Sequence, residues 1–155
     1  MTRKKILSAV IAAMLVLSLS ACAFAATGVG SYTTGKVAEG KVSVDTYLCA
    51  VTLDESGKIV GASFDMVQAS AGADVEATFE PQSKRDLGDA YGMKAASPIG
   101  KEFYEQHEAL AAWCVGKTLE EVVANYNGDA DLKAGCTVYI GGEIKALEDA
   151  VANAK

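Results

Sequence analysis

The sequence TYLCAVTLDESGKIVGASFDMV, residues 46–67, contains the strongest indication of the fold. Apolar residues in its first half alternate along one face, with the period of a half-buried β-strand. These residues are Tyr47, Cys49, Val51 and Leu53. The sequence Asp54–Lys58 predicts a tight turn in which Gly57 takes a positive φ. Alternation resumes over Ile59–Val67, where Val60, Ala62, Phe64 and Met66 are expected on one face, so the stretch predicts a β-hairpin.

The chain beyond the hairpin changes from alternating to helical patterns. We expect a third strand over Asp74–Phe79 and a long ordered loop over Glu80–Ala96. Ser97 and Pro98 predict a helix start, because serine caps helices and proline fits their first position. The residues of its apolar stripe are Ile99, Phe103, His107, Leu110 and Cys114.

Three further elements are expected towards Lys155. Thr118–Glu121 has the pattern of a capping box and predicts a second helix. Cys136–Ile140 indicates a short strand, and the apolar spacing over 144–151 indicates a final amphipathic helix. Strands followed by helices predict an α+β domain with an antiparallel sheet, built on the N-terminal hairpin, and helices packed on one face.

The first residues predict export. A basic start, Arg3–Lys5, precedes the apolar run Ile6–Leu19, which is the layout of a secretory signal. The following Leu-Ser-Ala-Cys sequence resembles the lipobox of bacterial lipoproteins, which implies lipidation of Cys22 and anchoring to the cell membrane outside the cytoplasm. We therefore expect a signal peptide over 1–21, a flexible glycine-rich tether over 22–42 and a single domain over 43–155.

Two alternatives to the lipid anchor remain. Cleavage before Ala26 would release a secreted protein, because Ala23–Ala25 also fits an A-x-A site. A retained membrane helix is the other alternative, although the apolar run is shorter than the roughly 20 residues that span a bilayer.

Charge and cysteine content exclude several classes of protein. The chain has a net charge of −6, and removal of the three basic residues Arg3–Lys5 on export would make the mature protein more acidic. This acidic charge argues against nucleic acid as a partner. Cys49, Cys114 and Cys136 have no zinc-ligand spacing. Buried free thiols, a Cys49–Cys136 disulfide and a reactive thiol remain as interpretations.

The residues from Lys84 through the first helix form the candidate binding surface, because aromatic faces and a few polar groups are what small-molecule pockets use. The candidates are Lys84, Tyr91, Gly92, Met93, Lys94, Tyr104, His107 and Trp113. The alternative is that these aromatic residues only pack in the core. His107 is the only histidine and lies on an apolar stripe, which favours a core histidine over a base or ligand.

Two resemblances add to these expectations. Lys84–Lys94, Gly100–Gln106 and Val115–Thr118 resemble small extracytoplasmic lipoproteins of anaerobic gut bacteria. The hairpin Val51–Val67 is similar to the opening hairpin of FMN-binding domains of secreted flavoproteins, which implies a small α+β flavin carrier in electron transfer. Many such domains attach FMN to a threonine in a Ser-Gly-Ala-Thr motif, whereas Ser70–Ala73 here lacks the threonine, so only non-covalent FMN fits.

The sequence contains no nucleophile elbow, P-loop or dinucleotide fingerprint. Two functional hypotheses follow. The first is a lipid-anchored domain that binds a small ligand or an envelope protein and has no catalysis of its own. The second is an electron-transfer domain with FMN held non-covalently beside Lys84, Arg85 or Lys94, and a purely structural envelope protein is the third alternative.

Overall fold

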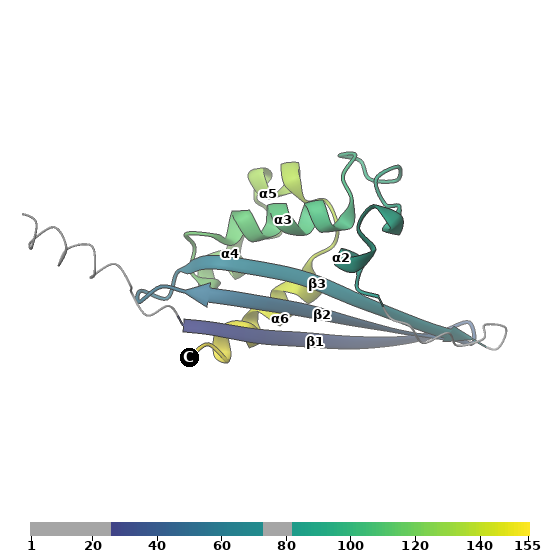
Figure 1. Cartoon of the computed structure of the whole chain (residues 1–155), viewed down its shortest axis with the longest axis horizontal. Coiled ribbons are helices and arrows are strands. Elements are labelled where there is room, and N and C mark those ends of the chain that lie inside the picture. Colours follow the sequence, from purple (N-terminus) through teal and green to yellow (C-terminus); the bar gives the residue numbers. More distant parts are fainter. Residues whose placement is uncertain (1–25, 73–81) are drawn as a thin grey trace, which may run out of the picture.

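The computed structural model describes residues 26–72 and 82–155. The predicted signal peptide, Cys22 and the strand expected over Asp74–Phe79 lie outside these residues. Figure 1 shows a three-stranded sheet with the helices gathered on one of its faces. The predicted α+β class, with helices on one face of an antiparallel sheet, is confirmed.

The sheet is antiparallel throughout, in the order β1-β2-β3. Its strands are β1 (Ala26–Ala38), β2 (Lys41–Leu53) and β3 (Ile59–Gly72). The predicted hairpin is β2–β3, and its turn has Gly57 at φ 80°. The Asp54 carboxylate closes this turn by accepting hydrogen bonds from Ser56 and from the Lys58 N–H.

An irregularity in the β2–β3 register changes which residues of β3 face the core. The shift lies between Thr52 and Leu53, and it pairs Leu53 with Ile59. Ile59 is therefore fully buried, while Val60 is 49% exposed on the opposite face. The prediction that Val60 shares a face with Phe64 is wrong, because a bulge reverses the alternation at this point.

The prediction of a flexible tether is wrong for residues 26–42, because Ala26–Ala38 pairs with β2 along its whole length. Glycines that look like linker residues serve packing instead. A Cβ built on Gly28 would lie 1.9 Å from the Ala150 carbonyl oxygen, and one on Gly30 would lie 2.1 Å from the Ala150 nitrogen. The absence of side chains at these positions lets a helix lie directly on β1.

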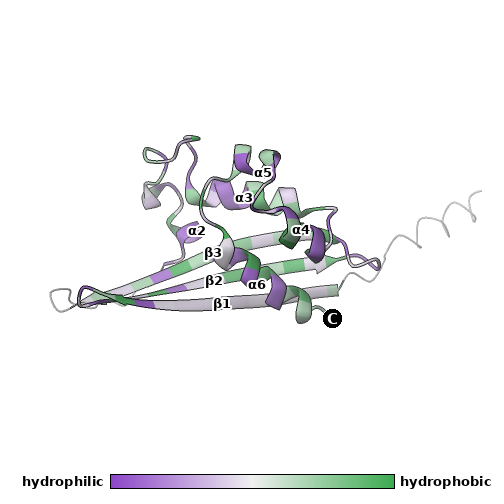
Figure 2. Ribbon diagram, turned by 180° about the vertical axis from the view of Figure 1, so that it is seen from behind, coloured by the Kyte–Doolittle hydropathy of each residue, from purple (hydrophilic) through white to green (hydrophobic). Residues whose placement is uncertain are grey.

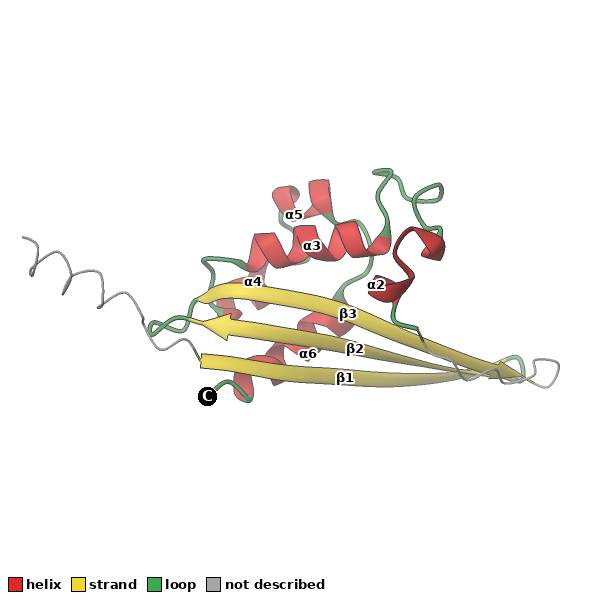
Figure 3. Ribbon diagram, viewed as in Figure 1, coloured by secondary structure: helices red, strands yellow, loops and turns green. Residues whose placement is uncertain are grey.

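Short helical segments occupy part of the predicted loop. These are α2 (Lys84–Leu87) and the 3-10 helix η1 (Gly88–Tyr91). Figure 3 shows the loop that follows them and leads to α3 (Phe103–Cys114). The helix expected from Ser97 begins only at Phe103, because Gly100 has φ 63° and Glu102 caps the helix together with Glu105.

The remaining helices are α4 (Leu119–Asn125), α5 (Ala130–Gly135) and α6 (Gly141–Ala152). The capping box of α4 and the C-terminal helix are confirmed. The strand expected over Cys136–Ile140 is wrong. This segment pairs with no strand among the described residues, and the N–H groups of Thr137 and Val138 instead donate to the buried Gln106 side chain.

The core lies between the sheet and the helices. Figure 2 shows hydrophobic and hydrophilic residues interspersed along β2 and β3. The largest fully buried apolar side chains come from β2, β3, α3, α4 and α6: Val51, Ile59, Phe64, Leu110, Val122 and Leu147. No helix within residues 26–72 or 82–155 is long and apolar enough to cross a bilayer.

The cysteines of the described chain are part of this core. Cys49, Cys114 and Cys136 are buried and free, so buried free thiols are confirmed and the Cys49–Cys136 disulfide is wrong. Burial raises the pKa of the Cys49 and Cys114 thiols to about 12 and that of Cys136 to about 11. A thiol is nucleophilic only as the thiolate, which excludes a reactive cysteine among these three near neutral pH.

Candidate functional site

Several predicted site residues meet at the N-terminal half of α3. The Lys84 ammonium group lies 4.5 Å from the centre of the Phe103 ring and 4.9 Å from that of Tyr91. The Phe103 ring in turn lies 4.0 Å from the His107 ring. Lys84 and Phe103 are buried, so this cation–π arrangement fastens α2 and η1 to α3.

The predicted loop residues beside this cluster are held by one buried carboxylate. Glu102 is 3% exposed and accepts hydrogen bonds of 2.9 Å from the N–H groups of Met93 and Lys94. Gly92 ends η1 at φ 74°, and the Tyr104 hydroxyl donates to Asp89 at 3.2 Å. These groups bind one another, which favours a structural role for the loop.

Trp113 lies apart from the other predicted residues, at the C-terminal end of α3. The Lys117 ammonium group is 4.4 Å from the centre of its ring and also donates to the Trp113 carbonyl. The structure therefore brings together Lys84, Tyr91 and His107 with the loop, but not Trp113.

His107 and Glu143 form a buried pair between α3 and α6. Their Nε2 and Oε1 atoms are 3.0 Å apart, and each side chain is 1% exposed. His107 Nδ1 and Glu143 Oε2 have no hydrogen-bond partner in the part of the chain that the structure describes. His107 is thus a core residue with one polar partner, and no group of three or more metal-ligating side chains occurs within the described ranges.

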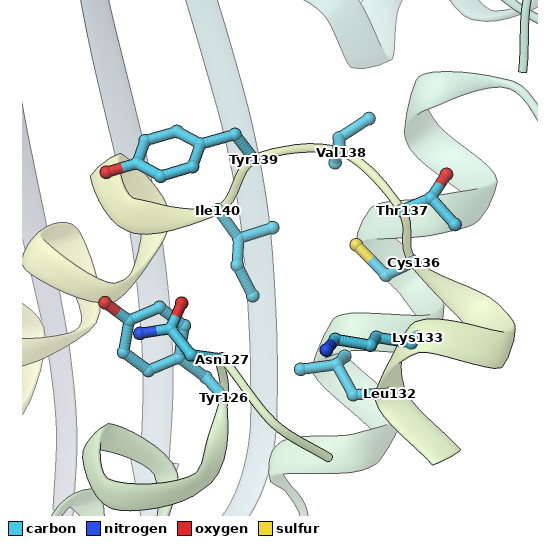
Figure 4. A pocket seen from close by; sticks show the side chains of 9 residues that line it. All are labelled: Tyr126, Asn127, Leu132, Lys133, Cys136, Thr137, Val138, Tyr139 and Ile140. Carbon is cyan, nitrogen blue, oxygen red and sulfur yellow. The ribbon is translucent and has the colours of Figure 1, made fainter. Parts of the chain in front are cut away.

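A surface cavity of about 310 Å³ lies beside the segment that joins α5 to α6. Figure 4 shows the Cys136 thiol and the Ile140 side chain directed into this space, with Tyr126 and Asn127 on its other side. Leu132 also lines it. Its walls are mixed, with apolar side chains next to amide and hydroxyl groups.

A second cavity, of about 330 Å³, lies where β1 and β2 meet the beginning of α6. We call it the tyrosine cleft, because its walls contain Tyr32, Tyr47, Tyr126 and Tyr139. The Tyr32 and Tyr47 rings are stacked, with centres 6.2 Å apart and an interplanar angle of 29°. Tyr126 and Tyr139 also line the first cavity, so the two cavities adjoin.

Two glycines bring these rings close to the backbone of α6. A Cβ on Gly142 would lie 2.4 Å from the Tyr47 ring, and one on Gly141 would lie 2.3 Å from the Tyr139 hydroxyl. No side chain of the described residues caps the beginning of α6, and the first N–H groups of a helix have no partner within it. The cleft therefore combines aromatic faces with polar groups of side chains and backbone.

The charge state of the cleft follows from burial. Desolvation raises the pKa of the Tyr47 hydroxyl, and the nearby Glu143 carboxylate raises it further, so Tyr47 remains a neutral donor. Lys145 lines the cleft and its ammonium group is 2.7 Å from the Glu148 carboxylate. The cleft can thus stack a flat ring and offer hydroxyl donors to its polar substituents.

The sequence did not predict this cleft as a site. Its four tyrosines come from β1, β2, the end of α4 and the α5–α6 segment, and the chain contains six tyrosines in all. The available signals were the tyrosine content and the Gly141-Gly142 pair before an apolar helical stripe. Neither signal places the rings together, because their meeting depends on β1 being a strand.

Comparison with known proteins gives one partial similarity. The chain is 36% identical over 90 residues to a chlorophenol reductase of Desulfitobacterium hafniense, an alignment that covers 47% of this chain and 28% of that protein. The chain thus matches little more than a quarter of the reductase's length. No family model matches the chain, and no solved structure matches it.

Proposed function

We propose that the protein is an extracytoplasmic binding domain that takes up a small planar aromatic molecule in the tyrosine cleft. The observation that carries this proposal is the gathering of four tyrosines around a cavity of about 330 Å³. Aromatic walls with a few polar groups, in a volume of at least about 300 Å³, are typical of small-molecule sites. The adjoining cavity provides room for a substituent.

The location in this proposal comes from the N-terminal sequence. Arg3–Lys5, the apolar run Ile6–Leu19 and Cys22 have the order of a lipoprotein signal, and a diacyl anchor supplies the two chains that stable attachment needs. Tethering at Cys22 would place β1 four residues from the membrane surface. Mass spectrometry of the mature N-terminal peptide tests this, and an unmodified Cys22 would contradict it.

The class of ligand is supported by the chemistry of the cleft and by the similarity to a chlorophenol reductase. A phenol would stack on the tyrosine rings and exchange hydrogen bonds with their hydroxyl groups. The alternative is FMN, whose ring system is also flat and whose phosphate could meet the uncapped first N–H groups of α6. Bound FMN would supply electron-transfer chemistry.

Two probes distinguish these candidates on the full chain purified in detergent. FMN binding is followed by quenching of flavin fluorescence, and 2-chlorophenol binding is followed by calorimetry. We expect Tyr139→Ala to weaken binding of the active probe roughly 2- to 13-fold, because one aromatic contact contributes about 0.5–1.5 kcal/mol. Tyr139 is 82% exposed, so its removal leaves the core intact.

A matched control is Tyr104→Ala, which removes a tyrosine that contacts Asp89 and does not line the cleft. It should bind like the parent chain. Equal losses in Tyr139→Ala and Tyr104→Ala would refute the cleft as the site, and a loss confined to Tyr91→Ala would return the site to the loop beside α3. Absence of binding for both probes would contradict the proposed ligand class.

A further inference from the structure

The face of the sheet that points away from the helices is left uncovered by every described element. Outward positions of the strands alternate with the buried ones, and Val29, Val37, Val42 and Val44 on this face are 66%, 76%, 45% and 37% exposed. A face of this kind on an antiparallel sheet is normally polar. Exposed valines on neighbouring strands therefore indicate that another surface packs against this face.

The apolar side chains concentrate where the strands extend past the helices, at the end distant from Ala26 (Figure 1). In the paired register, Val37, Val42 and Ala71 form one row, and Val44 and Ala69 form the next. These residues, apart from Val37, line a groove of about 340 Å³ together with Thr46, Val67 and Ser70.

Charge is almost absent from this face. Asp65 is the one acidic or basic residue at the outward positions of β1, β2 and β3, although such residues make up 22% of the chain. The Asp65 carboxylate accepts a hydrogen bond from the Arg85 N–H in α2, so it is already engaged at the sheet edge. An uncharged surface repels no second copy of itself, whereas the chain as a whole carries a net charge of −6.

The size of the face suits a dimer. A 13-residue strand is about 40 Å long and three strands are about 14 Å wide, from a rise of about 3.3 Å per residue and a strand spacing of about 4.8 Å. Two copies packed face to face would bury roughly 1,100 Å² in total, slightly above the minimum of about 1,000 Å² for a specific interface. Full overlap of the two faces needs a two-fold axis in the plane between them, and an axis along the strands meets this condition.

We propose that the protein forms a symmetric dimer, in which the uncovered sheet faces of two copies of this chain pack against each other. Since β2 is the central strand, an axis along the strands places each outward residue of β2 opposite the same residue of the second copy, with the two sheets about 10 Å apart. The same axis places both Ala26 ends on one side, which suits two copies anchored in one membrane if Cys22 is lipidated.

Cross-linking of the full chain in intact cells tests this dimer. Val44→Cys places a thiol at the centre of the apolar rows, and Val123→Cys places one on α4 at nearly the same exposure, 37% against 38%. The other described cysteines are buried, and the unsubstituted chain sets the background. The reagent is a bismaleimide that spans about 10 Å, the separation of packed sheets.

We expect Val44→Cys to give an adduct of twice the chain's mass that contains both of two differently tagged copies, and Val123→Cys to give none above background. Equal adducts from the two variants would overturn the proposal, as would the absence of an adduct from Val44→Cys. An adduct of Val44→Cys with a different protein would assign the face to that protein. Ligand binding in the tyrosine cleft is measured separately, so failure of either proposal leaves the other standing.

Discussion

Replacing Gly30 by alanine should destabilise the fold strongly, although the change adds one methyl group to a strand. The new Cβ would lie 2.1 Å from the Ala150 nitrogen and 2.4 Å from the Ala146 carbonyl oxygen, both in the backbone of α6. Ordinary contacts begin near 3.4 Å, so α6 must move by more than 1 Å. No side-chain rotation can relieve this clash, because both obstacles are backbone atoms.

The expected magnitude follows from what α6 buries. Ala146, Leu147 and Ala150 are fully buried under this helix, and a gap of 0.5–1 Å already forfeits a quarter to a half of their dispersion contacts. Overpacking of a core costs about 1–3 kcal/mol. Replacing glycine restricts the unfolded chain and so offsets about 0.4–1 kcal/mol of this cost, and we expect a net loss of about 1–2 kcal/mol in the free energy of unfolding.

Urea unfolding followed by far-ultraviolet circular dichroism measures this loss through the midpoint and slope of the transition. Gly35→Ala is the matched control in the same strand, because its Cβ meets only the Ser43 carbonyl oxygen, at 3.7 Å. It should leave stability unchanged or slightly raised. If Gly30→Ala and Gly35→Ala unfolded at the same urea concentration, the close approach of α6 to β1 would be refuted.

Three further predictions concern buried polar groups. Glu143→Leu should cost roughly 1–3 kcal/mol because it removes the one polar contact that His107 makes among the described residues, and adding His107→Leu should recover much of that loss. A double-mutant cycle of these two substitutions measures the coupling by unfolding, and additive losses would contradict it. Glu102→Ala should speed hydrogen exchange of the Met93 and Lys94 amides at least tenfold, whereas Glu108→Ala, with its side chain 60% exposed, should not. The pKa values of the three buried thiols, about 11 and 12, exceed those of thiols in an unfolded chain, so the unfolded state loses its thiol protons first as pH rises. The free energy of unfolding should therefore fall above about pH 9, by up to 1.4 kcal/mol per pH unit for each thiol. Unfolding at pH 7, 9 and 10 tests this, and a Cys114→Ala variant should show a shallower slope of stability against pH.

The hairpin could be predicted because its determinants are local. Alternation over Tyr47–Leu53 and a turn with Gly57 at a positive φ are both visible in a short window of sequence. The bulge at Thr52 could not be predicted from the sequence. Until the register with β2 is known, the apolar residues at the start of β3 fit either face of the sheet. Val60 was consequently assigned to the wrong face.

Strand β1 could not be predicted from the sequence, because its glycines fit both a flexible linker and a strand that packs closely against a helix. Gly28 and Gly30 indicate a linker by composition, yet they are required by a helix more than 100 residues later in the chain. The start of α3 was displaced for a local reason, since Glu102 and Glu105 cap the helix better than Ser97 does. Several residues before α3 can cap a helix, and their order in the sequence does not show which of them marks its start.

The candidate site shows the same division. The contact of Lys84 with Tyr91 was within reach of sequence reasoning because both lie in one loop. The partner of His107 was not, because Glu143 is 36 residues away on another helix. The tyrosine cleft was hidden entirely, since it needs β1, β2 and the beginning of α6 in place.

The covering of β1 by α6 has a consequence for the order in which the protein folds. The first described strand is packed against the last described helix, α6 (Figure 1), and the Thr27 N–H donates to the carbonyl of Lys155 at 3.2 Å. Contacts between such distant parts of a chain form slowly, because loop closure must precede them. The layer between β1 and α6 therefore cannot close while the ribosome is still making the C-terminal helix. A chain with this topology stays incompletely folded until α6 has been synthesised, which is the state that a protein needs if it crosses a membrane unfolded.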